Sequence, residues 1–256
     1  MTGEIRVIPL RGIPELREGD DLADELRAAA ERAGGFERKD VLVVAQKVVS
    51  KVEGRVVHLA DIEPSQRAHE LAADFDPRRM EVILRETKRI VRARPPLVIT
   101  ETKHGYVCAS AGVDSSNAGE PQTVVLLPRD PDASARVLRE RIGSALGLEI
   151  AVIVSDSFGR AWRQGTTDVA LGVAGLAPVL DLRGARDALG YELHATQIAI
   201  ADEIAGAAEL VMGKLEGVPA AIVRGVEVSG DGAGADLLMP HERDLFRGDA
   251  ELDSNP

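Results

Sequence analysis

The sequence contains only one cysteine, Cys108, and few aromatic residues. A single cysteine cannot form a disulfide framework or a cysteine-rich zinc site within one chain, and we expect Cys108 to be a small buried hydrophobic residue rather than a nucleophile. Aromatic residues make up 3% of the chain, which is too few to build the stacking platforms that bind single-stranded nucleic acid. The core is therefore expected to be aliphatic.

An excess of positive charge and long apolar runs are also missing. The formal net charge of −11 argues against binding to nucleic acid or to an anionic membrane surface, because both require accumulated Lys and Arg. No apolar run approaches the roughly 20 residues needed to span a bilayer, and the first residues lack the apolar region of a signal peptide. We expect a cytoplasmic protein, in which a phosphate-bearing ligand would need local basic residues or a bridging metal ion.

The common phosphate-binding motifs are absent too. The chain contains no Gly-x-x-x-x-Gly-Lys-Ser/Thr, which excludes a Walker-type P-loop, and no Gly-x-Gly-x-x-Gly opens a helix after a strand. None of the five histidines has a partner four residues away, the spacing of a helical zinc pair. A nucleotide site in this chain would have to be of another kind.

What the sequence does contain is an alternation of short aliphatic runs and amphipathic segments, which predicts an α+β protein with mixed sheets in two closely associated lobes. Strands are expected at 5–10, 40–45, 97–100, 105–108, 123–127, 150–154 and 220–223, and helices at 21–33, 65–75, 78–89, 133–146 and 195–215. The segment 161–176 is rich in Gly, Ala and Thr, and we expect a backbone or a ligand to approach it closely. We interpret residues 1–248 as one catalytic unit and 249–256 as a disordered tail.

The most informative segment is the apolar run 150–154, followed at once by Ser155, Asp156 and Ser157. A buried strand of this kind carries catalytic groups at its carboxyl end, and a carboxylate beside hydroxyls suits a hard divalent cation such as Mg²⁺ or Mn²⁺. Gly-Arg follows, and we expect the backbone to turn there and Arg160 to supply a positive charge for phosphate. The alternative interpretation is a strand that ends in a capped turn.

Two further segments carry polar residues after apolar sequence. Asp114 and Asn117 lie in a loop of small residues, and if this loop converges with Asp156 the two acids can share one or two divalent cations. Alone, the Asp114 segment is a common turn sequence. Lys47 and Lys51 follow the predicted strand 40–45 and could lie on one face of a helical turn, although an exposed basic turn is the alternative.

In their order and spacing, these motifs resemble those of the coenzyme F-420-0:L-glutamate ligase family, also called F-420 gamma-glutamyl ligase. The resemblance runs from about residue 4 to residue 246 and is carried by the segments 11–16, 18–22, 40–44, 50–55, 111–117, 154–160, 201–205, 212–213 and 223–225.

The resemblance implies a GTP-dependent ligase that adds L-glutamate to the deazaflavin precursor F-420-0 and extends a poly-γ-glutamate tail. The implied route is phosphorylation of the acceptor carboxylate by GTP and attack of the glutamate amine on the acyl phosphate. Such chemistry requires charge neutralisation on the γ-phosphoryl group, and the implied cofactors are two Mg²⁺ or Mn²⁺ ions per subunit, with K⁺ as a further candidate. The resemblance also implies an intertwined homodimer with the nucleotide groove near the subunit interface.

Residue by residue, the resemblance places Asp114, Asp156 and Ser157 at metal-binding positions, and we expect Asp114, Asp156 and Arg160 to take part in catalysis. The positions implied to bind the nucleotide are Ile13, Pro14, Glu15, Leu16, Gln46, Lys47, Lys51, Asn117, Met212 and Gly213.

One departure from the family concerns the segment after Met212 and Gly213, where archaeal members carry an acid and this chain carries Lys214. Either Glu216 replaces that metal ligand or one metal has fewer protein ligands. Gln46 and Lys47 stand where archaeal members resemble Ser-Thr. The alternatives for function are another nucleotide-dependent carboxylate–amine ligase and a non-catalytic nucleotide or metal sensor.

Overall fold

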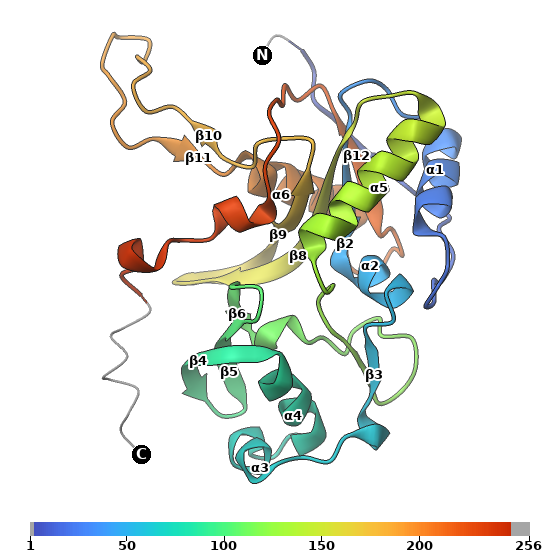
Figure 1. The fold of residues 1–256 in the computed structure, drawn as a ribbon, viewed down its shortest axis with the longest axis vertical. Coiled ribbons are helices and arrows are strands. Elements are labelled where there is room, and N and C mark those ends of the chain that lie inside the picture. The colour runs from blue at the N-terminus through green and yellow to red at the C-terminus, as the bar shows by residue number, and fades with distance from the viewer. Residues whose placement is uncertain (1–2, 247–256) are drawn as a thin grey trace.

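The computed structural model describes residues 3–246, so the predicted tail at 249–256 lies outside the described residues. Its centre is a five-stranded mixed sheet in the order β1-β12-β2-β8-β9 (Figure 1). The strands β2 and β8 are parallel, and the other neighbours are antiparallel. Their bounds are β1 Arg6–Pro9, β2 Val41–Ala45, β8 Ala151–Arg160, β9 Arg163–Ala174 and β12 Ala220–Arg224.

Helices cover both faces of this sheet, which explains why its central strands are apolar throughout. On one face lie α1 (Leu22–Arg32), α2 (Gln46–Val52) and α5 (Pro131–Leu146), and on the other lies α6 (Ile200–Met212). Strand β2 supplies side chains to both layers. Leu42 and Val44 pack with α1 and α5, whereas Val41 and Val43 pack with α6.

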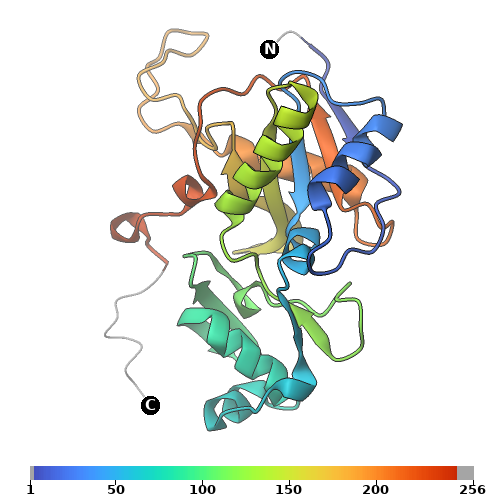
Figure 2. The ribbon, with the colours of Figure 1, turned by 45° about the vertical axis from the view of Figure 1, so that its right-hand side comes forward.

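Residues 56–126 form a second group of elements with an apolar core of its own, at the bottom of Figures 1 and 2. It is inserted in the chain between α2 and α5. The group contains β3 Val56–His58 paired with β7 Thr123–Val125, the helices α3 Gln66–Ala72 and α4 Pro77–Glu86, and a three-stranded antiparallel sheet of β4 Thr87–Arg94, β5 Leu97–Thr102 and β6 Val107–Ala109.

The remaining elements are short. An arm, at the upper left of Figure 1, carries β10 (Leu180–Asp181) and β11 (Gln197–Ile198), which pair with each other. The 3₁₀ helices are η1 Leu59–Asp61, η2 Ser110–Gly112, η3 Gly234–Leu237 and η4 His241–Arg243. None of the helices between residues 3 and 246 is both long and apolar enough to cross a lipid bilayer.

Besides the end of the helix expected at 65–75, which lies at Ala72, three predicted boundaries are wrong. The helix expected at 78–89 ends at Glu86, because Thr87 begins a strand that pairs with β5. The helix expected at 195–215 covers only α6, since Gln197–Ile198 pairs with β10 and Gly213 ends the helix with a positive φ of 59°.

The third wrong boundary concerns the predicted turn after Ser157. Strand β8 does not stop at Val154 but continues to Arg160, and β9 pairs with it along this length. The chain reverses at residues 161–162, where Trp162 has a positive φ of 57°. The capped-turn interpretation is therefore wrong, and the polar residues lie on a strand.

The close approach expected for 161–176 is confirmed at Gly172 of β9. A Cβ atom on this residue would overlap the backbone carbonyl of Pro131, at the start of α5. Only glycine lets α5 pack this closely on the sheet.

Candidate functional site

A cavity of about 660 Å³ lies at the carboxyl ends of the parallel strands β2 and β8. Ligands of open sheets with parallel strands commonly bind outside these ends. The walls come from the loop 13–16, the first turns of α2, the end of α6 and the loop that follows it. All the residues that the family resemblance assigned to the nucleotide line this cavity: Ile13, Pro14, Glu15, Leu16, Gln46, Lys47, Lys51, Asn117, Met212 and Gly213.

The basic segment after β2 is the helix α2, so the exposed-turn interpretation is wrong. The side chain of Lys51 is only 8% exposed, and its ammonium pairs with the carboxylate of Glu15 across the cavity. Gln46 is 1% exposed, and its Oε1 accepts a hydrogen bond from Ser50 Oγ at 2.9 Å. Its Nε2 has no hydrogen-bond partner among the described residues. Because an unpaired buried amide costs about 1–3 kcal/mol, the Nε2 of Gln46 is a candidate donor to a ligand.

The middle of strand β8, where its parallel pairing with β2 ends, presents oxygen donors on both faces, since successive side chains of a strand alternate. Ser155 and Ser157 share a face, and both hydroxyls donate to the carboxylate of Asp168 on β9, at 2.8 Å and 2.6 Å. Glu209 of α6 adds a second carboxylate, which accepts the backbone N–H of Asp168 at 2.9 Å and lies 3.5 Å from Ser157 Oγ. We call Ser157, Asp168 and Glu209 the β9-side oxygen set.

The carboxylate of Asp156 lies on the opposite face of β8. Burial, with a smaller contribution from the charge of Asp168, raises its pKa to about 7, against the opposing effects of the Ser157 N–H and the charges of Lys47 and Lys214. A carboxylate with this pKa binds a proton or a cation readily near neutral pH. A bound cation would therefore offset the negative charge of Asp156, which burial disfavours.

Asp114 reaches the same cavity through Lys47. The Lys47 ammonium donates to Asp114 Oδ2 at 2.6 Å and to Ser116 Oγ at 2.6 Å. Burial alone would raise the pKa of Asp114, but the hydrogen bonds from Lys47 and Ser116 outweigh it and hold the pKa below its ordinary value. The loop that carries Asp114 and the strand that carries Asp156 are thus both within reach of the charge of Lys47. We call Asp114 and Asp156 the Lys47-side acids.

Three predicted residues do not line the cavity, namely Asp114, which is only hydrogen-bonded to the cavity residue Lys47, and Arg160 and Glu216. Arg160 lies near the far end of the β8–β9 hairpin, where its guanidinium donates to the carbonyl of Gln164 at 3.2 Å. The carboxylate of Glu216 accepts the N–H of Leu215 at 3.0 Å and does not line the cavity. Lys214 does line it. This placement favours a metal with fewer protein ligands over replacement of the missing acid by Glu216.

Comparison with known proteins identifies the family to which this chain belongs. The model of the F420-0:gamma-glutamyl ligase family matches residues 12–225. The chain belongs to this family. The match includes the cavity loop, α2, β8, β9 and α6, so the family assignment covers the segments that build the cavity.

Relatives within the family are similar over most of their length. The chain is 43% identical over 251 residues to the coenzyme F420:L-glutamate ligase of Methanothermobacter thermautotrophicus, covering 95% of this chain and 99% of the relative. It is 45% identical over 251 residues to the enzyme of the same name from Methanopyrus kandleri, covering 95% and 98%. The corresponding Methanocaldococcus jannaschii protein is 45% identical over 216 residues, covering 83% and 86%. The family predicted from the motifs is confirmed.

The oxygen donors suit the kind of metal that the family resemblance implies. No three His, Cys, Asp or Glu side chains within residues 3–246 are grouped closely enough to hold a metal ion by themselves. Mg²⁺ is commonly bound by only one or two carboxylates, with waters and substrate phosphates completing the shell. The β9-side oxygen set has this composition, with two carboxylates and one hydroxyl.

Two members of the β9-side oxygen set were missed by sequence reasoning. Asp168 lies in the small-residue segment 161–176, and Glu209 lies on a helix assigned no polar function. A recognised β8–β9 hairpin would have found Asp168, because it pairs directly with Ser157 in the strand register. Glu209 carries no comparable local signal, since a Glu on a helix is ordinarily solvated.

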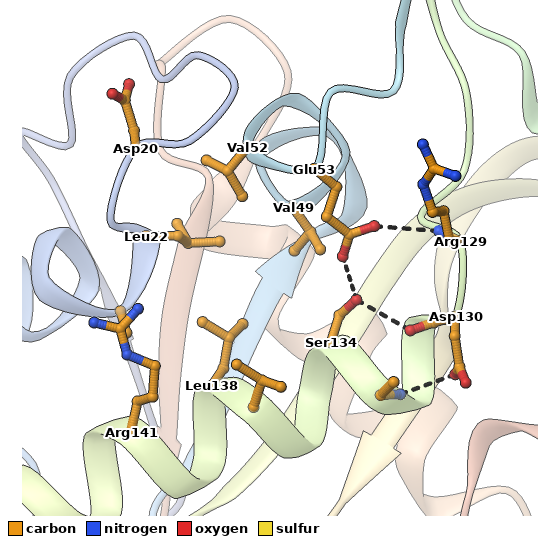
Figure 3. Close-up of a pocket in the computed structure, with 13 residues that line it drawn as sticks. Asp20, Leu22, Val49, Val52, Glu53, Arg129, Asp130, Ser134, Leu138 and Arg141 are labelled. Carbon is orange, nitrogen blue, oxygen red and sulfur yellow. Dashed lines mark hydrogen bonds between the residues drawn. The ribbon is translucent and has the colours of Figure 1, made fainter.

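A second cavity, of about 410 Å³, lies behind α2 against α1 and α5 (Figure 3). Apolar side chains such as Val49, Val52 and Leu138 form much of its wall. The carboxylate of Glu53 is already bonded within the protein, to the hydroxyl of Ser134 and to the backbone N–H of Arg129. No residue assigned to the ligand by sequence lines this cavity, and we place the functional site on the other side of α2.

Proposed function

We propose that the protein is a coenzyme F420:L-glutamate ligase that uses GTP and two divalent metal ions, Mg²⁺ or Mn²⁺, and that extends a poly-γ-glutamate tail. The ligase activity is supported by the family and by the printed names of relatives that match most of the chain. The single observation that carries the GTP proposal is the cavity, because all the residues assigned to the nucleotide line it.

The charges of the cavity favour a phosphate-bearing ligand. Lys47, Lys51 and Lys214 all line it, although the chain has a formal net charge of −11. Four acids, Glu15, Asp156, Asp168 and Glu209, line it as well, so the cavity favours phosphate that arrives together with divalent cations rather than a free anion. In the proposed complex, Lys51 contacts the phosphates, and the free Nε2 of Gln46 donates to an acceptor oxygen or nitrogen of the nucleotide.

The metal ions would be held on the two faces of β8. The β9-side oxygen set offers one site, with Ser157 as its neutral ligand and Asp168 and Glu209 as its acids. The Lys47-side acids offer the other. When bound, such ions supply charge neutralisation at the γ-phosphoryl group of GTP, which the formation of an acyl phosphate requires. The protein's part is to fix the donors on a rigid strand pair, so that the phosphate meets them in one orientation.

The test is a mass measurement. We expect incubation of the protein with F-420-0, L-glutamate, GTP and Mn²⁺ to give products heavier by one and then several glutamates, with release of phosphate. Omission of GTP is the matched control, and its replacement by ATP tests the nucleotide preference. Binding of GTP with no phosphate release in the presence of both substrates would favour a sensor and overturn the proposal.

We further propose that the protein acts as a homodimer. The arm that carries β10 and β11 projects from the body of the molecule (Figure 1), and it exposes the large apolar side chains of Leu180, Leu189 and Tyr191. Apolar groups gathered on a projecting segment are typical of a surface that is covered in an assembly. Light scattering at micromolar concentration is expected to give twice the mass of the chain, and a monomer mass at all concentrations would contradict this.

A further inference from the structure

Both carboxylate oxygens of Asp114 accept hydrogen bonds within the protein, although the side chain is 40% exposed. Its Oδ1 accepts the N–H of Ser116 at 2.8 Å, and its Oδ2 accepts both the Ser116 hydroxyl at 2.8 Å and the Lys47 ammonium at 2.6 Å. The Lys47 side chain is 15% exposed, and its ammonium also donates to Ser116 Oγ. Lysine, serine and aspartate therefore form a closed triangle.

Lys47 also acts on the second Lys47-side acid. Its charge lowers the pKa of Asp156, against the larger effect of burial. The ammonium thus lies within electrostatic range of both acids. A cation within range of two carboxylates offsets the repulsion between their negative charges.

We propose that Lys47 is the resident counter-ion of Asp114, and that a divalent cation has to displace its ammonium before Asp114 can become a metal ligand. A Mg²⁺ or Mn²⁺ ion held by Asp114 would have to share the carboxylate with the Lys47 ammonium. Two cations so close together repel strongly in a partly buried site. Lys47 therefore weakens metal binding at Asp114 in the nucleotide-free protein.

This inference rests on the metal role proposed above for Asp114, and it goes beyond that role in assigning Lys47 as a competitor of the metal. The two proposed metal sites, one on each face of β8, differ in this respect. The β9-side oxygen set includes no lysine among its hydrogen-bond partners, so the same competition does not apply there. A single resident ammonium makes the two proposed metal sites unequal.

The test is a calorimetric titration of the nucleotide-free protein with Mn²⁺ alone. We expect Lys47→Met to gain a binding step, or to bind Mn²⁺ about tenfold or more tightly at the weaker step, because an occupying charge has been removed. Lys51→Met is the matched control, since it removes a lysine from the same helix and cavity whose partner is Glu15 rather than a Lys47-side acid. The gain should disappear in the double variant Lys47→Met/Asp114→Asn.

Three results would overturn the inference. They are an unchanged or weaker Mn²⁺ affinity in Lys47→Met, an equal gain in Lys51→Met, and a gain that survives the loss of Asp114. Thermal unfolding of each variant shows that it is folded, and Lys47→Gln serves as a second variant if Lys47→Met unfolds. The mass measurement on the wild-type protein judges the proposed ligase function separately, because it does not depend on how tightly Mn²⁺ binds without nucleotide.

Discussion

Replacing Asp156 by asparagine is expected to make the metal-free protein more stable and inactive as a ligase. In the folded protein, burial holds the pKa of Asp156 near 7, against an ordinary value of 3.8. The ionised carboxylate is therefore disfavoured in the folded state, and the unfolding free energy of the wild type falls as the pH rises from about 4 to about 7. The asparagine side chain of the variant does not ionise, so this loss does not occur.

The magnitude follows from the difference between the two pKa values. Each unit corresponds to about 1.4 kcal/mol, which sets an upper bound of about 4 kcal/mol. Asp156 is partly exposed, and solvent screening reduces the effect, so we expect a gain on the order of 2 kcal/mol at pH 8. At pH 4.5 the wild-type carboxyl is protonated in the folded state, and the two proteins should differ much less.

The assay is urea denaturation of both proteins at pH 4.5 and pH 8 in a metal-free buffer. Other groups titrate alike in the two proteins, so the change in their stability difference with pH reports Asp156 alone. Asp114→Asn is the matched control with the opposite sign. Its pKa is lowered by Lys47 and Ser116, so the variant should be less stable at pH 8, with the loss fading as the pH falls below about 4. An Asp156→Asn variant that is no more stable than the wild type at pH 8 would refute the reasoning.

The remaining predictions concern three other positions. Gly172→Ala should lower the unfolding free energy by about 2 kcal/mol or more, because its Cβ would overlap the carbonyl of Pro131. Thermal unfolding checks this, with Gly159→Ala as the comparison, since a Cβ there meets no atom within 4 Å and the φ of Gly159 is not positive. Gln46→Leu should weaken nucleotide affinity about tenfold in a calorimetric titration, since the unpaired Nε2 is removed. Asp168→Asn should weaken Mn²⁺ binding about tenfold or more, and unchanged binding would exclude Asp168 as a ligand.

Sequence reasoning located the central elements because local pattern determines them. The runs that became β2 and β12 are buried on both faces, so they stay apolar throughout and are visible without knowledge of their neighbours. The helix that became α5 was visible because Gly147 ends it in a left-handed conformation. The apolar runs and the helix-ending glycine are formed by residues close together in the chain, so both can be recognised without knowledge of the fold.

The errors arose where pairing between distant segments overrides local preference. Ser155, Asp156 and Ser157 have the composition of a turn, yet β9 holds them in an extended strand through residue-by-residue pairing. Thr87 follows a helix without an intervening glycine or proline, and only its pairing with Thr102 of β5 makes it a strand residue. Asp168 was missed for the same reason.

The insertion of residues 56–126 between α2 and α5 has a consequence for the order of folding. The strands β2 and β8 are neighbours in the central sheet, but residues 46–150 separate them in the chain. Closing so long a loop costs about 4 kcal/mol of chain entropy, and prior folding of the inserted elements shortens the flexible path, with a saving of about 0.6 kcal/mol for each halving. Since contacts between nearby residues form fastest, we expect the inserted group to form before the β2–β8 pair, and the cavity to be completed last.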